Sequence, residues 1–272
     1  MLRPQGHPAK SKFLAINSCN QLTIGDNVRY TRKHTMPRSV ISLLFIFLLG
    51  TAAHAKDESI LLFNGKDLTD WHKVGGNGVF EVKDGAIHGH GVNINGNTFL
   101  TSDKTYDNFV LEMEARFEMD ETIANSGIQF RSANVNNHLT GYQYEIENKA
   151  ENNTGGVYDE GGTRGYISPF IPCHWIQTTN YKELMEKHGA DVAAFQKKTF
   201  TLLKKRDWNH IKIRCQDGHV QTWLNGEKQA DFKDPEGTGY RSGVIGLQLH
   251  GGKKCDVSWR NIRLTPLSKP GG

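Results

Sequence analysis

Cysteine and proline are scarce in this sequence, and it lacks a long apolar run. Four of the 272 residues are cysteine and 8 are proline, against 29 glycines, a composition that excludes a collagen-like chain and a disulfide-dense scaffold. The main apolar stretch, Val40 to Leu49, includes Ser42 and is much shorter than the roughly 20 residues that a membrane-spanning helix needs. We therefore expect no membrane span.

The predicted mature chain, residues 56–272, also lacks a strong net charge of one sign. The sequence holds 33 Lys and Arg against 29 Asp and Glu, but seven of these bases and only one acid lie in residues 1–55. The remaining 26 bases and 28 acids give residues 56–272 a net charge of −2. The basic balance belongs to the N-terminal segment, so we expect no nucleic acid partner.

The N-terminal segment predicts export. Met36 opens a short basic stretch, the apolar run follows, and Ala53-His54-Ala55 fits the small-x-small pattern of a cleavage site. These features predict a signal peptide over residues 36–55, cleaved after Ala55, and a periplasmic or secreted product. Residues 1–35 precede this signal without hydrophobic periodicity, and we expect them to be absent from the native product. The single folded domain is predicted to span residues 56–272.

Three cysteines, Cys173, Cys215 and Cys255, lie beyond the predicted cleavage site. An odd number does not make a disulfide framework, and no pair has metal-ligand spacing. Cys215 and Cys255 fall in predicted strands in phase with apolar neighbours, which predicts buried thiols. A single bridge between these two in an oxidising compartment is the alternative.

Strand signals dominate the rest of the chain. Residues 109–119 alternate between apolar and charged side chains, and Asp84-Gly85 and Asn225-Gly226 are typical hairpin turns. One helical insertion is predicted near residues 180–198 from apolar spacings of three and four, with two short helices as the alternative because Gly189 interrupts it. This pattern predicts an all-β fold, a two-sheet antiparallel sandwich of jelly-roll type.

Strand parity places a set of planar polar groups and rings on one face. Successive residues of a strand point to opposite sides, so apolar residues that pack inward leave their neighbours pointing outward. The outward set is Gln129, Arg131, Gln143, Glu145, Glu147, Gln221, Trp223, Asn225, Gln248 and His250. Such groups bind sugars through paired hydrogen bonds and stacking, although a solvated outer face is the simpler interpretation.

Residues 155–166 form the densest unusual segment. Five glycines surround Tyr158, Asp159, Glu160, Arg164 and Tyr166. Glycines allow a backbone to approach a ligand closely, whereas the competing interpretation is a flexible loop with incidental charge. We expect this segment to contribute to a ligand site.

Several short motifs, taken in order, resemble one known family. They are Leu62-Phe-Asn-Gly65 with Trp71, Asp84-Gly85-Ala-Ile87, Ser126-Gly-Ile-Gln-Phe-Arg131, Gly141-Tyr-Gln143, Tyr158-Asp-Glu160, Trp223-Leu-Asn-Gly226, Gly243-Val-Ile-Gly-Leu-Gln248-Leu-His250 and Arg260-Asn-Ile-Arg. Over residues 59–267 the sequence is similar to the 3-keto-disaccharide hydrolase domain family. The resemblance implies a concanavalin A-like jelly roll and substrates in which the sugar 3-hydroxyl is oxidised to a ketone.

The implied reaction needs a base near C2, help for the enolate, and an acid near the leaving oxygen. We expect Glu145 or His250 to be the base, Gln129 and Arg131 to hold the keto oxygen, and Asp159 or Glu160 to protonate the leaving group. Gln143, Tyr158, Arg164, Trp223 and Gln248 are expected to bind the substrate.

No cofactor is required by this scheme, although a divalent cation held by carboxylates and His250 could replace Arg131. The alternative function is a lectin-like module that binds unoxidised sugars without turnover. An ordinary glycosidase needs two carboxyls across the scissile bond, and the sequence has no Glu-x-Asp-x-x-Glu strand motif that would supply them.

Overall fold

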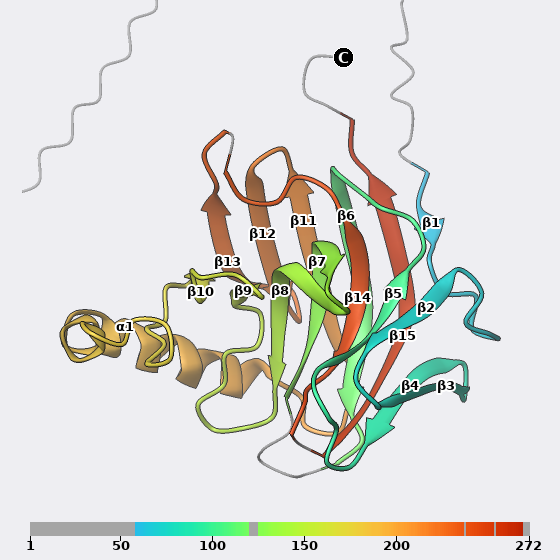
Figure 1. Cartoon of the computed structure of the whole chain (residues 1–272), viewed down its shortest axis with the longest axis horizontal. Coiled ribbons are helices and arrows are strands. Elements are labelled where there is room, and N and C mark those ends of the chain that lie inside the picture. Colours follow the sequence, from blue (N-terminus) through green and yellow to red (C-terminus); the bar gives the residue numbers. More distant parts are fainter. Residues whose placement is uncertain (1–57, 120–124, 237, 253, 269–272) are drawn as a thin grey trace, which may run out of the picture. The chain divides into compact units, whose positions relative to one another are not determined.

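The computed structural model describes residues 58–119, 125–236, 238–252 and 254–268, which belong to one compact unit of the chain. The predicted signal peptide and residues 1–35 lie outside the described residues. Within these residues two antiparallel sheets pack face to face, and one helix lies beside them (Figure 1). This is the predicted two-sheet sandwich.

Sheet A has eight strands within the described residues. Its order is β13-β12-β11-β6-β15-β4-β3, and β1 pairs with β15. The bounds are β1 Ile60–Leu61, β3 Val79–Lys83, β4 Ala86–Gly91, β6 Phe109–Phe117, β11 Asn209–Gln216, β12 His219–Leu224, β13 Glu227–Lys233 and β15 Cys255–Pro266.

Sheet B has seven strands within the same residues, in the order β10-β9-β8-β7-β14-β5-β2. The bounds are β2 Trp71–Gly75, β5 Thr98–Ser102, β7 Asn125–Val135, β8 His138–Glu147, β9 Val157–Glu160, β10 Tyr166–Ser168 and β14 Val244–Leu249. Every pairing in the two sheets is antiparallel.

The core fills the space between the inner faces of the two sheets. Strand β6 alternates as predicted, with Phe109, Leu111 and Met113 buried and the residues between them half-exposed. Sheet B contributes Ile128 and Tyr144 from its own inner face. Because the side-chain period of a strand is two, this core also fixes which residues occupy the two outer faces.

Tight turns close the hairpins as the sequence predicts. Asp84 and Gly85 have φ values of 52° and 72°, and Asn225 and Gly226 have 51° and 89°. Two consecutive residues with positive φ form the turn whose twist matches that of the flanking strands. The turns therefore hold β3 against β4 and β12 against β13.

The insertion is a single helix, α1, which spans Tyr181–Leu202. The alternative of two short helices is wrong, because Gly189 continues the helix and a Cβ there would meet only Met185 at 3.6 Å. The helix lies beside the β10–β9–β8 edge of sheet B (Figure 1), and its buried residues are Val192 and Thr199. None of the helical segments that the structure describes combines the length and apolarity that a bilayer crossing requires.

Cys173, Cys215 and Cys255 are buried, and no disulfide joins any two of them. Cys215 lies opposite Phe109 at one end of β6, whereas Val257, two residues beyond Cys255, lies opposite Phe117 at the other end. At roughly 3.3 Å per residue, this places the two cysteines far beyond the ~7 Å Cα limit of a disulfide. The alternative of a Cys215–Cys255 bridge is therefore wrong.

Candidate functional site

A pocket of about 690 Å³ opens on the outer face of sheet B, the face turned away from sheet A. Of the residues predicted for the site, Gln143, Glu145, Tyr158, Glu160 and His250 line it. The first four come from the adjacent strands β8 and β9, and His250 directly follows β14. Strand parity therefore brought together groups that lie far apart in the sequence.

Glu145 is the central carboxyl of the pocket and is almost completely buried. Asn125 Nδ2 donates to its Oε1 at 2.5 Å, and Gln143 Nε2 donates to its Oε2 at 2.9 Å. Burial, reinforced by the negative charge of Glu147, raises the pKa of Glu145 to about 8, although the two amide donors oppose the shift. A carboxylate with this pKa is a stronger base than an ordinary glutamate and titrates near neutral pH.

A ladder of amides orients Gln143. Gln129 and Gln248 both donate to Gln143 Oε1, the second at 2.8 Å, so its Nε2 is directed toward Glu145. The Gln143 side chain lies across Gly127 on β7, where a Cβ would stand 2.6 Å from Gln143 Cδ. The absence of a side chain at Gly127 is what lets β8 and β14 join their amides.

A second carboxylate, Glu147, lies beside Glu145. Lys149 Nζ contacts Glu147 Oε1 at 2.7 Å, and the Asn153 backbone N–H donates to Glu147 Oε2 at 3.0 Å. Asn125 Nδ2 reaches Glu147 Oε1 at 3.2 Å and so bridges the two carboxyls. Its own Oδ1 is buried and accepts no hydrogen bond from the described residues, so a hydroxyl of a ligand would satisfy it.

Glu160 on β9 is another carboxyl that lines the pocket. Asn97 Nδ2 donates a hydrogen bond to Glu160 Oε1 at 2.9 Å, and His138 Nε2 lies 2.8 Å from the same oxygen. Both partners occupy the same oxygen, so Oε2 is the atom that can carry a proton. This carboxyl is close enough to Glu145 to contribute to the rise in the Glu145 pKa.

His250 contributes an imidazole. Its Nδ1 lies 2.6 Å from the Gly251 carbonyl oxygen, and because a carbonyl only accepts, Nδ1 carries the hydrogen. In the neutral ring Nε2 is then the basic nitrogen. The ring itself lines the pocket.

The segment between β10 and α1, together with α1 itself, supplies an aromatic rim. Trp175 is 57% exposed, and its Nε1 donates to Tyr158 Oη at 3.2 Å. His174 lies edge-on to Trp175 at 4.9 Å and to Tyr181 at 5.9 Å. Exposed rings at a polar pocket are suited to stacking on the CH face of a sugar.

The adjacent carboxyls Asp159 and Glu160 point to opposite sides of sheet B, because β9 is a strand. Tyr158 lies opposite Gln143 on the outer face, whereas Asp159 lies opposite the core residue Tyr142. The expected convergence of Asp159 with Glu145 and His250 is therefore wrong, since Asp159 does not line the pocket.

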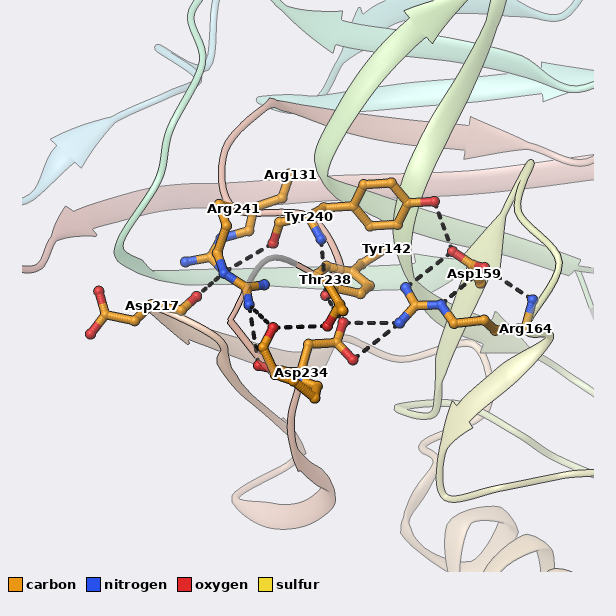
Figure 2. Close-up of polar contacts among 10 residues, drawn as sticks. Arg131, Tyr142, Asp159, Arg164, Asp217, Asp234, Thr238, Tyr240 and Arg241 are labelled. Atoms are coloured by element: carbon orange, nitrogen blue, oxygen red, sulfur yellow. Dashed lines mark hydrogen bonds and ion pairs between the residues drawn. The ribbon is translucent and has the colours of Figure 1, made fainter.

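Asp159 and Arg164 belong instead to a network of hydrogen bonds that joins β9 to the loop after β13 (Figure 2). Arg164 Nε donates to Asp159 Oδ2 at 3.2 Å, and its Nη1 donates to Asp234 Oδ2 at 2.9 Å. Tyr240 Oη donates to Asp159 Oδ1 at 2.9 Å, and Tyr142 Oη donates to Asp234. Arg164, like Asp159, does not line the pocket, so the structure gives it a bracing role.

Arg131 was predicted to point outward but is fully buried. The register between β7 and β8 shifts after Phe130, and Arg131 has a φ of 50°. This bulge turns its guanidinium toward the loops, where Nε and Nη1 donate to the carbonyls of Asp107, Asp217 and Tyr240, and Nη2 donates to Asn108 Oδ1 at 3.0 Å.

Trp223 lies on the other sheet. It belongs to β12 of sheet A, half-buried, with Lys212 Nζ 5.4 Å and Lys228 Nζ 5.7 Å from its ring centre. The alternation of residues along a strand predicts to which side the Trp223 ring points, but it does not predict which of the two sheets the strand joins. The expectation that Trp223 shares a face with Gln143 is wrong.

Gln129 and Gln248 lie beneath the pocket wall and act through Gln143.

Several residues of the pocket were missed from the sequence. They are Asn97, Asn125, Lys149, Asn153, His174, Trp175 and Tyr181. Glu147 was placed on the outward face and Tyr166 in the glycine-rich segment, but neither was given a role in the site. The pocket residues that the structure describes do not present three His, Cys or carboxyl donors within 4.8 Å of one another. A cation in place of Arg131 therefore lacks the ligand set expected for it, and we derive no step through one.

The fold and the site define a β-sandwich protein with an acidic, aromatic-rimmed pocket on one sheet. Residues 58–265 match the model of the 3-keto-alpha-glucoside-1,2-lyase-like domain, and the chain belongs to this family. No curated protein matches the sequence at a significant level.

Solved structures share the fold at low identity. A Bacillus subtilis protein of unknown function with a galectin-like fold is 12% identical, with 78% of this chain and 96% of that chain covered and a TM-score of 0.51. A candidate glycosyl hydrolase from Parabacteroides distasonis is 22% identical (77% and 94% covered, TM-score 0.48). The carbohydrate-binding module CBM66 from B. subtilis is 14% identical (72% and 95% covered, TM-score 0.47).

Proposed function

We propose that this protein is an exported carbohydrate-active enzyme that cleaves 3-keto-glycosides by removing the C2 proton and eliminating the substituent at C1. The observation that carries this proposal is Glu145, a buried carboxyl with a raised pKa, held by two amides in a pocket that also contains Glu160 and His250. Membership of a lyase-like family supports the same chemistry.

The reaction has two steps. In the first, the base takes the C2 proton, and the electrons of the C2–H bond form an enolate across C2 and C3. In the second, the C3 ketone re-forms, a C1–C2 double bond appears, and the C1–O bond breaks while its oxygen takes a proton. Addition of water across the double bond then completes net hydrolysis.

We assign the base to Glu145, because two donors hold its ionised form and its raised pKa increases its basicity. Gln143 replaces Arg131 and Gln129 as the group that faces the keto oxygen, since its amide nitrogen has a second hydrogen to donate. Glu160 protonates the leaving oxygen, and Asp159 is excluded from this role by its position. His250 lines the same pocket and is given no step in this scheme.

The aromatic rim binds the leaving part of the substrate. Trp175 lies just before α1 and Tyr181 is its first residue, and both line the pocket. A sugar ring seated between them and Glu160 would place its glycosidic oxygen toward the proposed acid. Disaccharides and aryl glycosides both offer a flat apolar face of this kind.

The test is release of the aglycone from a 3-keto-glucoside, measured for the wild-type protein and Glu145→Gln. Wild-type turnover should rise with pH toward about 8 and level off above it, because the ionised base is the active form. Glu145→Gln should lose at least ~100-fold in kcat/KM. Activity that falls as pH rises through 8 would instead make Glu145 the acid, and an unaffected Gln variant would reject the assignment.

The same assay separates the enzyme from a lectin-like module. The exposed Trp175 ring and the unsatisfied Asn125 Oδ1 would serve binding as well as catalysis. Tight binding of an unoxidised glycan, without turnover of its 3-keto form, would favour the lectin.

A further inference from the structure

We propose that Glu81, His88 and His90 form a binding site for a divalent transition-metal ion, with Zn²⁺ as the test ion, on the outer face of sheet A. Among the described residues, this is the group of three potential ligands whose donor atoms all lie within 4.8 Å of one another. It lies on the sheet opposite the pocket and is unrelated to the sugar chemistry proposed above.

The hairpin β3–β4 brings the three side chains together. Glu81 lies directly opposite His88 in the β3–β4 register, and His90 follows His88 by two residues, so all three point to the same face. The two imidazole rings stack with their centres 5.0 Å apart. The turn at Asp84-Gly85 fixes this register, because it permits only one pairing of the strands.

The distances between the donor atoms suit a tetrahedral ion. His88 Nδ1 lies 3.3 Å and His90 Nε2 lies 3.6 Å from Glu81 Oε1. With metal–ligand bonds of roughly 2.0–2.1 Å, neighbouring ligand atoms of a tetrahedral zinc site lie roughly 3.3 Å apart. The donor atoms of the two histidines lie within 4.8 Å of each other. Because the two rings are stacked, at least one of them must turn on binding so that both lone pairs point at the ion.

Asp256 on β15 orients the buried ligand. His88 Nε2 lies 2.7 Å from Asp256 Oδ1, and donation of the Nε2 hydrogen to this carboxylate makes Nδ1 the nitrogen with the lone pair. Metal-binding histidines almost always carry such an outer carboxylate or carbonyl partner.

The bound ion would stabilise the edge of sheet A that strand β3 forms. Strand β3 ends sheet A and pairs only with β4. Glu81 from β3 and His90 from β4 would share the ion, and His88 would connect it through Asp256 to β15. Glu81 and His90 are partly exposed, so a fourth position is open to water. Two imidazoles and a carboxylate favour Zn²⁺, Ni²⁺ or Cu²⁺ over Mg²⁺ or Ca²⁺.

The test is calorimetric titration of the chelator-treated protein with ZnCl₂, together with its thermal unfolding. We expect one Zn²⁺ per chain and an increase in Tm on binding. His90→Ala, at the more exposed of the two histidines, should lose both effects without a folding defect. Asp256→Asn should weaken binding roughly 10–100-fold, the range seen when an outer partner is removed.

Two variants serve as controls. His210 and Glu112 form a pair on the outer face of sheet A at 3.6 Å without a second histidine, so His210→Ala should leave Zn²⁺ binding unchanged. Glu145→Gln should leave it unchanged as well. Absence of saturable Zn²⁺ binding in the wild-type protein, unchanged binding in His90→Ala, or loss in Glu145→Gln would each overturn the proposal.

Discussion

At the scale of single residues, Gly127 decides whether the proposed base is correctly supported. In Gly127→Ala the new Cβ would stand 2.6 Å from Gln143 Cδ, so the Gln143 amide must move away from Gln248 and Glu145. We expect kcat on a 3-keto-glucoside to fall roughly tenfold or more, the size of loss that a small misplacement of a catalytic group produces.

Gly189→Ala is the matched control for this change. Gly189 has room for a Cβ within α1, so its replacement should stabilise the protein by roughly 0.4–1 kcal/mol and leave turnover intact. A Gly127→Ala variant with wild-type kcat would show that the amide ladder does not position Glu145.

Glu145 should also make stability depend on pH. Its folded pKa of about 8 exceeds the ordinary value of 4.5, so between these two pH values the folded state holds a proton that the unfolded state has lost. The free energy of unfolding therefore falls as pH rises through this window, by up to ~1.4 kcal/mol per pH unit. Urea unfolding at pH 5 and pH 8 should show a smaller fall in Glu145→Gln, and equal falls in both proteins would contradict the burial argument.

Arg131 should matter for stability and not for chemistry. Its replacement by Ala would leave the carbonyls of Asp107, Asp217 and Tyr240 without this donor, and Asn108 Oδ1 would keep only the Asp217 backbone N–H. We expect a loss of at least ~3 kcal/mol in the free energy of unfolding, because each buried acceptor without a partner is costly. Arg263→Ala, at an exposed position of β15, should change it by no more than ~0.5 kcal/mol. An Arg131→Ala protein that stays stable but loses turnover would contradict this prediction and would support a catalytic role for Arg131.

At the scale of elements, α1 forms one wall of the pocket and is held by few buried contacts. Val192 packs with Tyr166, Ile171 and Cys173 in a small cluster separate from the main core. Val192→Asp should release the helix and raise KM roughly tenfold, which corresponds to about 1.4 kcal/mol of lost binding. Ala193→Asp, on the exposed side, should not. Limited proteolysis within residues 181–202 should report the release independently of activity.

The face of the sheet on which a strand residue lies could be predicted well from the sequence. Gln143, Glu145 and Gln248 occupy one face because a period of two is strict within a strand. Arg131 could not be placed, because a bulge reverses parity and leaves little trace in the pattern. The prediction for Trp223 was wrong for a different reason, because the alternation of residues does not indicate which sheet a strand joins. Trp175 lies in a segment without periodicity, so no pattern could assign it to the pocket.

At the scale of the whole molecule, export remains a prediction from the sequence. We expect material recovered from the periplasm or medium to begin at Lys56, because the small-x-small pattern ends at Ala55. N-terminal sequencing measures this directly. A product that begins at residue 1, or that stays in the cytosol, would contradict it.

The pairing of β1 with β15 closes the folded domain on itself. Ile60 lies opposite Leu264 and Leu61 opposite Arg263, so the first and last strands of the domain run side by side in sheet A, while the pocket opens from sheet B. A short linker could therefore join the two ends in a circularly permuted protein, with the chain reopened at a surface turn. By the same geometry the domain could be inserted into a loop of another protein, because its two ends lie side by side.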